Sequence, residues 1–252
     1  MTTRQSFQRK LLQFSLIELL VVVAILAVLA SLLQPGLSKI TLQAKSIQCQ
    51  SNLKAIGSAL DLYTEDFQRY PSNNRQIWYG HHVSWDDTLG YSGHDGRMID
   101  NNFINSVNAP EPSKMYSCPV HEEHHTATDA YPRSYKMNCQ PGSWPTYEGG
   151  ISGLWDHGEA QGISINSVPQ PSGLIILLEA NGNLGNGYDS GTFNPDPQRE
   201  IINNTPSRSH DNKFSYLFCD WHVQLYTIEE TVNPSKTGWQ DSGKFWTRKV
   251  GD

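Results

Sequence analysis

The sequence predicts an α+β fold, in which a long N-terminal helix packs on a small antiparallel β-sheet with long loops. Three observations predict it: an apolar run over residues 14–33, helical periodicity that continues to about residue 70, and short β-rich runs beyond it. They divide the 252 residues into a basic leader (1–13), a transmembrane helix (14–33), an amphipathic continuation of that helix (34–70) and a β-rich head domain (71–252).

The composition is that of an ordinary folded protein. Hydrophobic residues make up 37% of the chain, and Gly and Pro together number 34, which excludes collagen-like and fully disordered chains. The net charge of −6 and the pI near 5.8 argue against a strongly basic nucleic-acid-binding protein. We therefore expect no nucleic-acid partner.

Residues 14–33 read FSLIELLVVVAILAVLASLL and contain one charged residue, Glu18. At ~1.5 Å per residue they form a helix of about 30 Å, the thickness of the hydrocarbon core of a bilayer. A signal peptide, the competing interpretation, usually has an apolar region of ~7–15 residues that ends at a cleavage site of small residues. The longer run found here favours a retained membrane helix surrounded by lipid.

The charges that flank this helix predict its orientation. Arg4, Arg9 and Lys10 precede it with no acidic residue, and cytoplasmic flanks are enriched in Lys and Arg. The residues after Leu33 hold 16 basic and 24 acidic side chains, a composition that suits translocation rather than docking on anionic lipid. We expect the N-terminus in the cytoplasm and the acidic part on the other side of the membrane.

Glu18 is the exception in the apolar run. A carboxylate at the bilayer centre costs roughly 2.5–3.5 kcal/mol on insertion scales. Because Glu18 lies one turn inside the segment, it either reaches the interface or pairs with a cation when helices associate. Charge alone leaves both interpretations open.

Residues 14–26, FSLIELLVVVAIL, resemble the N-terminal methylation motif of type IV pilins and type II secretion pseudopilins. The resemblance implies that a prepilin peptidase cleaves between Gln13 and Phe14, that the new amino group is methylated, and that Glu18 pairs with the terminal amine of a neighbouring subunit. It implies as partners other pilin-like subunits, the peptidase and an inner-membrane secretion or pilus assembly platform. The location implied is the bacterial inner membrane, with a single span, a periplasmic head and entry into a filament.

The chain departs from the family at the cleaved bond, where the family has Gly and this chain has Gln13. Two outcomes stay open: a processed subunit, or an uncleaved chain that remains a non-polymerising, membrane-anchored periplasmic binding protein. Binding of glycans would use exposed aromatic side chains, although packing in the core is the favoured role for the tryptophans. The seven are Trp78, Trp85, Trp144, Trp155, Trp221, Trp239 and Trp246.

The helix is expected to kink or break briefly at Pro35-Gly36, because Pro lacks an N–H group, and to end near residues 69–70, before Pro71. Apolar residues recur at three- and four-residue steps on the face expected to pack on the sheet. They are Leu37, Ile40, Ala44, Ile47, Leu53, Ile56, Leu60, Tyr63 and Phe67.

In the head domain, residues 71–133 are expected to be loops with short helices or strands, and 174–179 a central strand. Residues 214–219 and 222–227 predict a hairpin. The second position of a two-residue turn requires a positive φ, which favours Gly, and Trp221 occupies this position. We therefore expect a longer or bulged turn. The Gly- and Asn-rich residues 181–198 predict a surface loop.

Residues 46–71 resemble the helix and exit of a pseudopilin-like subgroup that carries a C-terminal His-x9-Asp-Gly element. Nine residues separate His210 from Asp220 here, and Trp221 replaces the Gly. No motif of a catalytic nucleophile or metalloprotease accompanies them. We interpret His210 and Asp220 as residues that hydrogen-bond the hairpin backbone, and we expect a structural protein rather than an enzyme.

The four cysteines are Cys49, Cys118, Cys139 and Cys219, and four cysteines allow three full pairings. Cys118 and Cys139 flank one loop, so we favour a disulfide between them. Closing a loop of this size should stabilise the folded protein by ~3 kcal/mol. With Cys118 paired to Cys139, we interpret Cys49 as a buried free thiol.

Two metal sites are weaker alternatives. Cys118, His121, His124 and Cys139 have ligand types suited to zinc, but a thiol cannot both bridge and ligate, and their spacing matches no known zinc motif. Some pseudopilins hold calcium in a C-terminal loop, and oxygen ligands suited to it are available here. These are Asp189, Asn194 and Asp196. We expect no cofactor, with calcium as the alternative.

Overall fold

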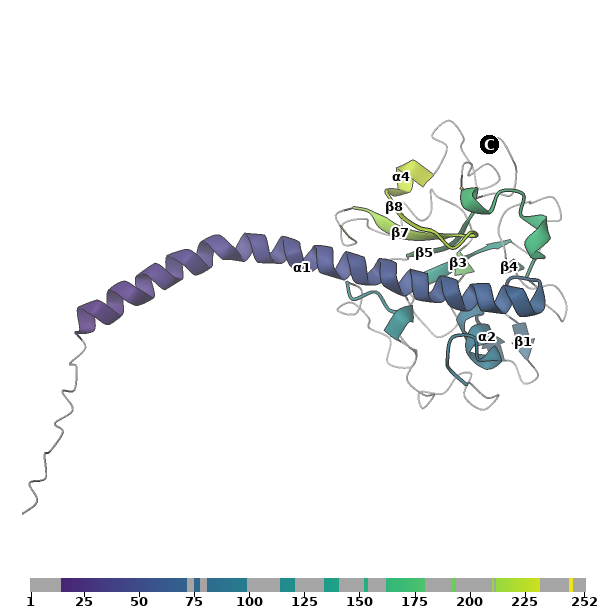
Figure 1. The fold of residues 1–252 in the computed structure, drawn as a ribbon, viewed down its shortest axis with the longest axis horizontal. Coiled ribbons are helices and arrows are strands. Elements are labelled where there is room, and N and C mark those ends of the chain that lie inside the picture. The colour runs from purple at the N-terminus through teal and green to yellow at the C-terminus, as the bar shows by residue number, and fades with distance from the viewer. Residues whose placement is uncertain are drawn as a thin grey trace, which may run out of the picture. The chain divides into compact units, whose positions relative to one another are not determined.

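The computed structural model describes residues 15–71, 75–77, 81–98, 114–120, 134–140, 152–153, 162–179, 192–193, 210, 212–231 and 245–246. The chain divides into two compact units, residues 1–42 and 43–252, and helix α1 contributes residues to both (Figure 1). In chain order the elements are α1 (Leu16–Phe67), β1 (Arg75–Ile77), β2 (His81–Val83), α2 (Trp85–Ser92), η1 (Lys114–Tyr116), β3 (Tyr135–Gln140), β4 (Ser152–Gly153), η3 (Ile165–Ser167), η4 (Pro171–Gly173), β5 (Ile175–Glu179), β6 (Thr192–Phe193), β7 (Phe214–Phe218), β8 (Val223–Tyr226) and α4 (Ile228–Thr231).

We expected the helix either to kink or to break briefly at Pro35-Gly36. Helix α1 continues through both residues, so it has no break there. The helix ends at Phe67, two residues before the predicted end. Gln68 adopts a φ of 54°, in the left-handed region, which stops helical propagation just before Pro71.

The buried face of α1 begins later than the sequence suggests. Leu53, Ile56 and Leu60 of the predicted apolar stripe are fully buried, whereas Leu37, Ile40 and Ile47 are mostly exposed. The prediction that the stripe packs on the sheet is therefore wrong for Leu37, Ile40 and Ile47, and Phe67 at the end of the stripe is also exposed. Helical periodicity shows which residues share a face, but burial also requires a partner surface.

The main sheet has the strand order β4-β3-β5-β7-β8. Strands β3, β5, β7 and β8 are antiparallel, which confirms the predicted sheet, and β5 is the predicted central strand. The short strands β4 and β6 both add to β3 in parallel. Because β6 lies inside residues 181–198, that segment is not solely the surface loop that its composition predicts.

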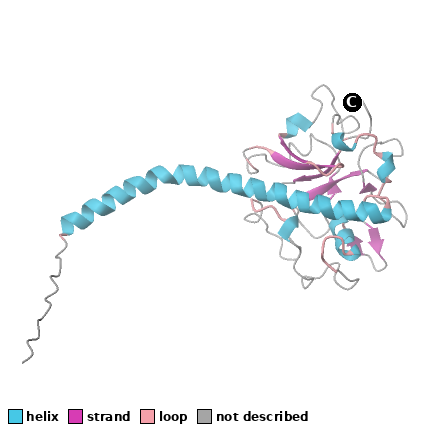
Figure 2. Cartoon of the chain, in the orientation of Figure 1, coloured by secondary structure: helices cyan, strands magenta, loops and turns pink. Residues whose placement is uncertain are grey.

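Apolar clusters lie on both faces of this sheet, and Figure 2 shows its strands beside the C-terminal part of α1. Along β7, Phe214, Tyr216 and Phe218 join a cluster with Trp246. On the opposite face, Leu217 joins a cluster that contains the buried residues of α1. Alternate side chains of one strand therefore enter two apolar clusters, which explains the nearly continuous apolar sequence of β7.

The turn between β7 and β8 has the longer form expected from Trp221. The Trp221 amide donates to the Phe218 carbonyl at 2.9 Å, and the Phe218 amide donates to the His222 carbonyl at 3.0 Å. Trp221 has a φ of 68° in a three-residue loop, the arrangement of a turn with a bulge. Its indole Nε1 donates to Asp61 Oδ1 at 2.7 Å, which fastens the turn to α1.

Residues 84–98 contain a short helix, in agreement with the short helices or strands expected among the loops of residues 71–133. Helix α2 begins after Ser84, whose amide donates to Asp87 Oδ2 at 3.0 Å, and it ends at Ser92, followed by Gly93 with a φ of 77°. Arg97 beyond it forms an ion pair with Asp95 at 2.6 Å and lies over the ring of Tyr116. This segment is thereby joined to η1.

The close approach of α1 to β7 depends on Gly57. A Cβ atom there would lie 3.2 Å from Leu217 Cδ1 and 3.7 Å from Trp221 Cβ. A side chain at this point requires Leu217 to give way by a few tenths of an ångström.

We predict that Gly57→Val lowers the free energy of unfolding by about 1–3 kcal/mol, because it overpacks this contact. The control is Ser58→Val, which places the same side chain at an exposed position of the same helix. Denaturant unfolding of the full-length chain in detergent, followed by tryptophan fluorescence, measures both. Equal stability of the two variants would contradict the close contact.

Candidate functional site

The first candidate region is the N-terminal part of α1, which presents an apolar surface on all sides. Its Leu, Ile and Val side chains from Leu16 to Leu33 are 48–86% exposed. Among the described residues, α1 is the one helix that is long and apolar enough to cross a membrane. Such a surface is stable only when lipid or other protein covers it.

Glu18 caps the N-terminus of this helix. The amide of Ser15 donates to Glu18 Oε2 at 3.0 Å, and the amide of Ile17 donates to Ser15 Oγ at 3.3 Å. These two bonds satisfy N-terminal amides that have no partner within the helix. The processing residues Gln13 and Phe14 lie outside the described residues.

The second candidate region is a buried cluster in the unit of residues 43–252. Cys49 of α1 forms a disulfide with Cys118, and their Cα atoms are 5.3 Å apart. This corrects the predicted Cys118–Cys139 bridge, because one sulfur forms only one such bond, and it also corrects the free thiol predicted at Cys49. Cys139 lies on β3, opposite Ser152 of β4.

Hydrogen bonds hold the Cys118 segment against α1. Asn52, three residues after Cys49, donates from Nδ2 to the carbonyl of Ser117 at 2.9 Å. The amide of Cys118 donates to Ser134 Oγ at 2.8 Å. The hydroxyl of Tyr135 donates to the Cys49 carbonyl at 3.3 Å. Burial, reinforced by the charge of Glu179, raises the pKa of Tyr135 well above its ordinary value, so this hydroxyl remains a donor.

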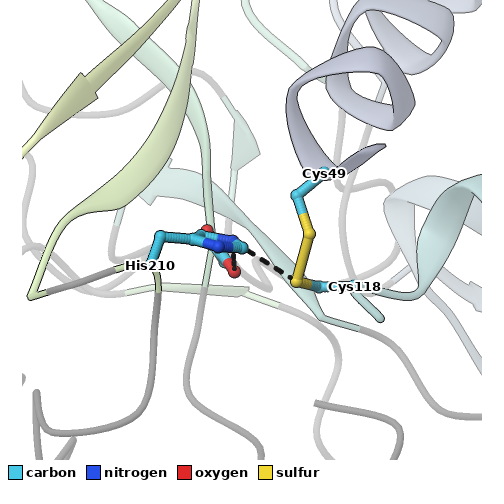
Figure 3. A group of neighbouring side chains, drawn as sticks. Cys49, Cys118 and His210 are labelled. Atoms are coloured by element: carbon cyan, nitrogen blue, oxygen red, sulfur yellow. Dashed lines mark hydrogen bonds and ion pairs between the residues drawn. A yellow bond between two sulfur atoms is a disulfide. The ribbon is translucent and has the colours of Figure 1, made fainter. Parts of the chain in front are cut away.

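His210 and Glu179 complete the cluster. His210 Nε2 lies 2.9 Å from Glu179 Oε1 and 3.5 Å from Cys118 Sγ, and Figure 3 shows the imidazole directed toward the disulfide. Both side chains are buried, and Glu179 Oε2 accepts a hydrogen bond from the Ser215 amide at 3.0 Å. The side chain of His210 therefore lies in the core, which corrects the prediction that it bonds the hairpin backbone.

Asp220 lies on the turn of the hairpin. Its Oδ1 accepts a hydrogen bond from the His222 amide at 3.3 Å and also contacts His222 Nδ1. The structure thus gives different surroundings to the two ends of the His-x9-Asp element: His210 in the core and Asp220 on an exposed turn.

Cys219 is the free cysteine among the cysteines whose side chains the structure describes, and it is buried. Burial raises the pKa of its thiol well above the ordinary value, while a hydrogen bond with Tyr70 acts in the opposite direction. A thiol that stays protonated is a poor nucleophile, so Cys219 serves packing.

One set of side chains has the composition of a catalytic triad. His94 Nδ1 lies 2.7 Å from Ser92 Oγ, and its Nε2 lies 2.9 Å from Asp66 Oδ2. However, Ser92 Oγ is also within hydrogen-bond distance of the carbonyls of Thr88 and Leu89, as expected for a helical serine that bonds its own backbone. The hydroxyl proton of Ser92 is directed to these carbonyls and not to His94. We therefore interpret the three side chains as a contact at the end of α2.

Several predicted ligands cannot be placed. His121, His124, Asp189, Asn194 and Asp196 lie outside the described residues, and so does the side chain of Cys139. Both metal alternatives built on them remain predictions. Sequence reasoning missed the role of Glu179, although an acidic residue at the end of the predicted central strand was a usable signal.

Comparison with known proteins supports the N-terminal resemblance. A 64-residue segment in the N-terminal part of the chain is 42% identical to type II secretion system core protein G of Pseudomonas aeruginosa and 39% identical to that of Escherichia coli. The segment is 25% of this chain and covers 45% and 44% of these relatives, less than half of each. No family model and no solved structure matches the chain. The resemblance to type II secretion pseudopilins is thus confirmed for the N-terminal quarter.

We predict that peptide mapping of the oxidised, unreduced protein recovers Cys49 and Cys118 in one linked peptide. Replacing both with Ser should lower the free energy of unfolding by about 4 kcal/mol, because the bridge closes a long loop in the unfolded chain. Denaturant unfolding measures the loss, and Cys219→Ser is the single-site control. A Cys118–Cys139 peptide would contradict the pairing.

Proposed function

We propose that the chain is a structural, pseudopilin-like subunit of a type II secretion or type IV pilus-like assembly. The apolar part of α1 anchors it in the bacterial inner membrane, and the same segment enters a helical filament. The observation that carries this proposal is that a single acidic residue, Glu18, lies in the otherwise apolar N-terminal segment of α1, which can span a membrane, in a part of the chain that is similar to core protein G.

Glu18 has two roles in this proposal. Within the chain it caps α1 through the Ser15 amide, using Oε2. In the assembly its charge pairs with the amino terminus of a neighbouring subunit, in surroundings where an unpaired charge is costly. Capping requires only an acceptor atom, whereas pairing requires the negative charge, so the two roles are separable by substitution.

Processing and topology belong to the same proposal. A prepilin peptidase removes residues 1–13 despite Gln13, Phe14 becomes the methylated N-terminus, and the acidic head occupies the periplasm. The head domains coat the assembly and contact an inner-membrane platform. Their role is structural, and no turnover is involved.

A non-polymerising, membrane-anchored binding protein is the competing function. Gln13 favours it, because an uncleaved chain has no amine at Phe14 to receive Glu18. No observation on the described residues favours glycan binding: Trp85 and Trp246 are buried in the core, and Trp221 is fastened to α1.

We predict that Glu18→Gln abolishes association of the subunits while leaving the helix intact, because the amide oxygen still accepts from Ser15 but carries no charge. Glu18→Asp should retain part of the association. The control is Ser15→Ala, which removes the capping hydroxyl and keeps the carboxylate. Co-purification of two differently tagged full-length copies from solubilised membranes measures association.

Association that survives in Glu18→Gln would overturn the charge pairing. Intact-mass measurement of the same preparations tests processing separately. Loss of residues 1–13 with a methyl group on Phe14 supports the pseudopilin-like subunit, and a full-length mass supports the uncleaved anchor.

A further inference from the structure

Four metal-ligating side chains converge in the core at the disulfide. Cys49, Cys118, Glu179 and His210 each offer one ligand atom, and these atoms all lie within 4.8 Å of one another. All four residues are buried. They come from α1, from the segment after η1, from the end of β5 and from a position four residues before β7, so the tertiary fold brings them together.

The surroundings of the disulfide are unusual for a bridge that serves stability alone. A disulfide needs no charged neighbour, whereas a buried carboxylate and imidazole lose solvation that their mutual contact only partly offsets. Glu179 is oriented by the Ser215 amide at Oε2, and its Oε1 faces His210 Nε2. That nitrogen also faces Cys118 Sγ. His210 Nε2 therefore faces a sulfur directly, and a carboxylate oxygen of Glu179 lies within 4.8 Å of both sulfurs.

We propose that these four residues form a tetrahedral zinc site when Cys49 and Cys118 are reduced. Two thiolates, an imidazole nitrogen and a carboxylate oxygen are the ligand types that Zn²⁺ takes in four-coordinate sites. Thiolates disfavour calcium and magnesium, which require oxygen ligands. The metal also compensates most of the negative charge that two thiolates and a carboxylate bring into the core.

Disulfide and zinc exclude each other, because each uses both sulfur atoms. A dithiol reductant supplies two electrons and two protons to the S–S bond and becomes a disulfide itself, which leaves two thiols in the chain. Zn²⁺ then replaces the two thiol protons, which are released to solvent, and His210 binds through the lone pair of Nε2 as a neutral imidazole that carries its ring proton on Nδ1. This site differs from the loop set of Cys118, His121, His124 and Cys139, with which it shares one residue.

The test uses the full-length protein in detergent, freed of metal, either oxidised or reduced with dithiothreitol that is then removed anaerobically. The probe is Co²⁺. We expect one Co²⁺ per reduced chain, with the intense near-ultraviolet absorption of cobalt–thiolate bonds and the visible bands of a tetrahedral ion, and displacement by Zn²⁺. The oxidised chain should give neither signal. No thiolate–cobalt signal after reduction would overturn the proposal.

Variants identify the ligands. Glu179→Gln and His210→Gln should each weaken Co²⁺ binding by about tenfold or more. Cys219→Ser and His222→Gln are the matched controls outside the cluster and should bind as the wild type does. The double variant His121→Gln, His124→Gln should also bind normally. If the double variant loses the signal and His210→Gln keeps it, the loop set holds the metal and the proposal fails.

A measurement on the unmodified chain covers the case in which the variants fail to fold. X-ray absorption of the zinc-loaded, reduced wild type should show two sulfur ligands at about 2.3 Å and two nitrogen or oxygen ligands at about 2.0–2.1 Å. A shell of nitrogen and oxygen alone, or of four sulfurs, would overturn the assignment. These results do not depend on the association of subunits, so they stand or fall separately from the proposed function.

Discussion

The apolar surface between Leu16 and Leu33 is the constraint on which the behaviour of this chain depends. Each exposed Leu or Ile side chain is worth about 1.5–3 kcal/mol when it is removed from water, and the helix carries such side chains on every face. Lipid removes that cost, but lipid is as apolar as a neighbouring helix, so hydrophobicity gives no reason for one such helix to prefer another. Specific association therefore depends on close packing and on the polar group in the segment, Glu18.

The C-terminal half of α1 obeys a different requirement, because its partner is a sheet. Leu53, Ile56 and Leu60 enter an apolar cluster of the head, and Gly57 lets the helix approach Leu217. The Cys49–Cys118 bond and the Asn52 hydrogen bond fix the same helix to a segment more than sixty residues away in sequence. One helix thus belongs to an apolar anchor at its start and to a cross-linked core at its end.

The sequence predicts the elements whose causes are local and misses the contacts whose causes are tertiary. The apolar run of β5 and the composition around Asp220 and Trp221 are enough to predict a central strand and a hairpin with a bulged turn. The pairing of Cys118 is not local. Nearness in the chain favours Cys139 as its partner, but the entropic cost of closing a loop rises only weakly with loop length. The packing of α1 on the sheet places Cys49, and not Cys139, next to Cys118. His210 is misassigned for the same reason.

The contact between Glu179 and His210 beside the disulfide has a physical meaning beyond its own energy. Buried polar pairs are often no more stabilising than apolar residues of the same volume, so Glu179 and His210 add little stability that Leu or Phe would not. What they add is a set of donor atoms at the sulfurs. A disulfide and a zinc ion each join Cys49 to Cys118, and therefore α1 to the same segment of the head. A core in which either a disulfide or a zinc ion joins these cysteines keeps the same architecture when the redox state changes. Apolar residues in place of Glu179 and His210 would leave the reduced cysteines without this link.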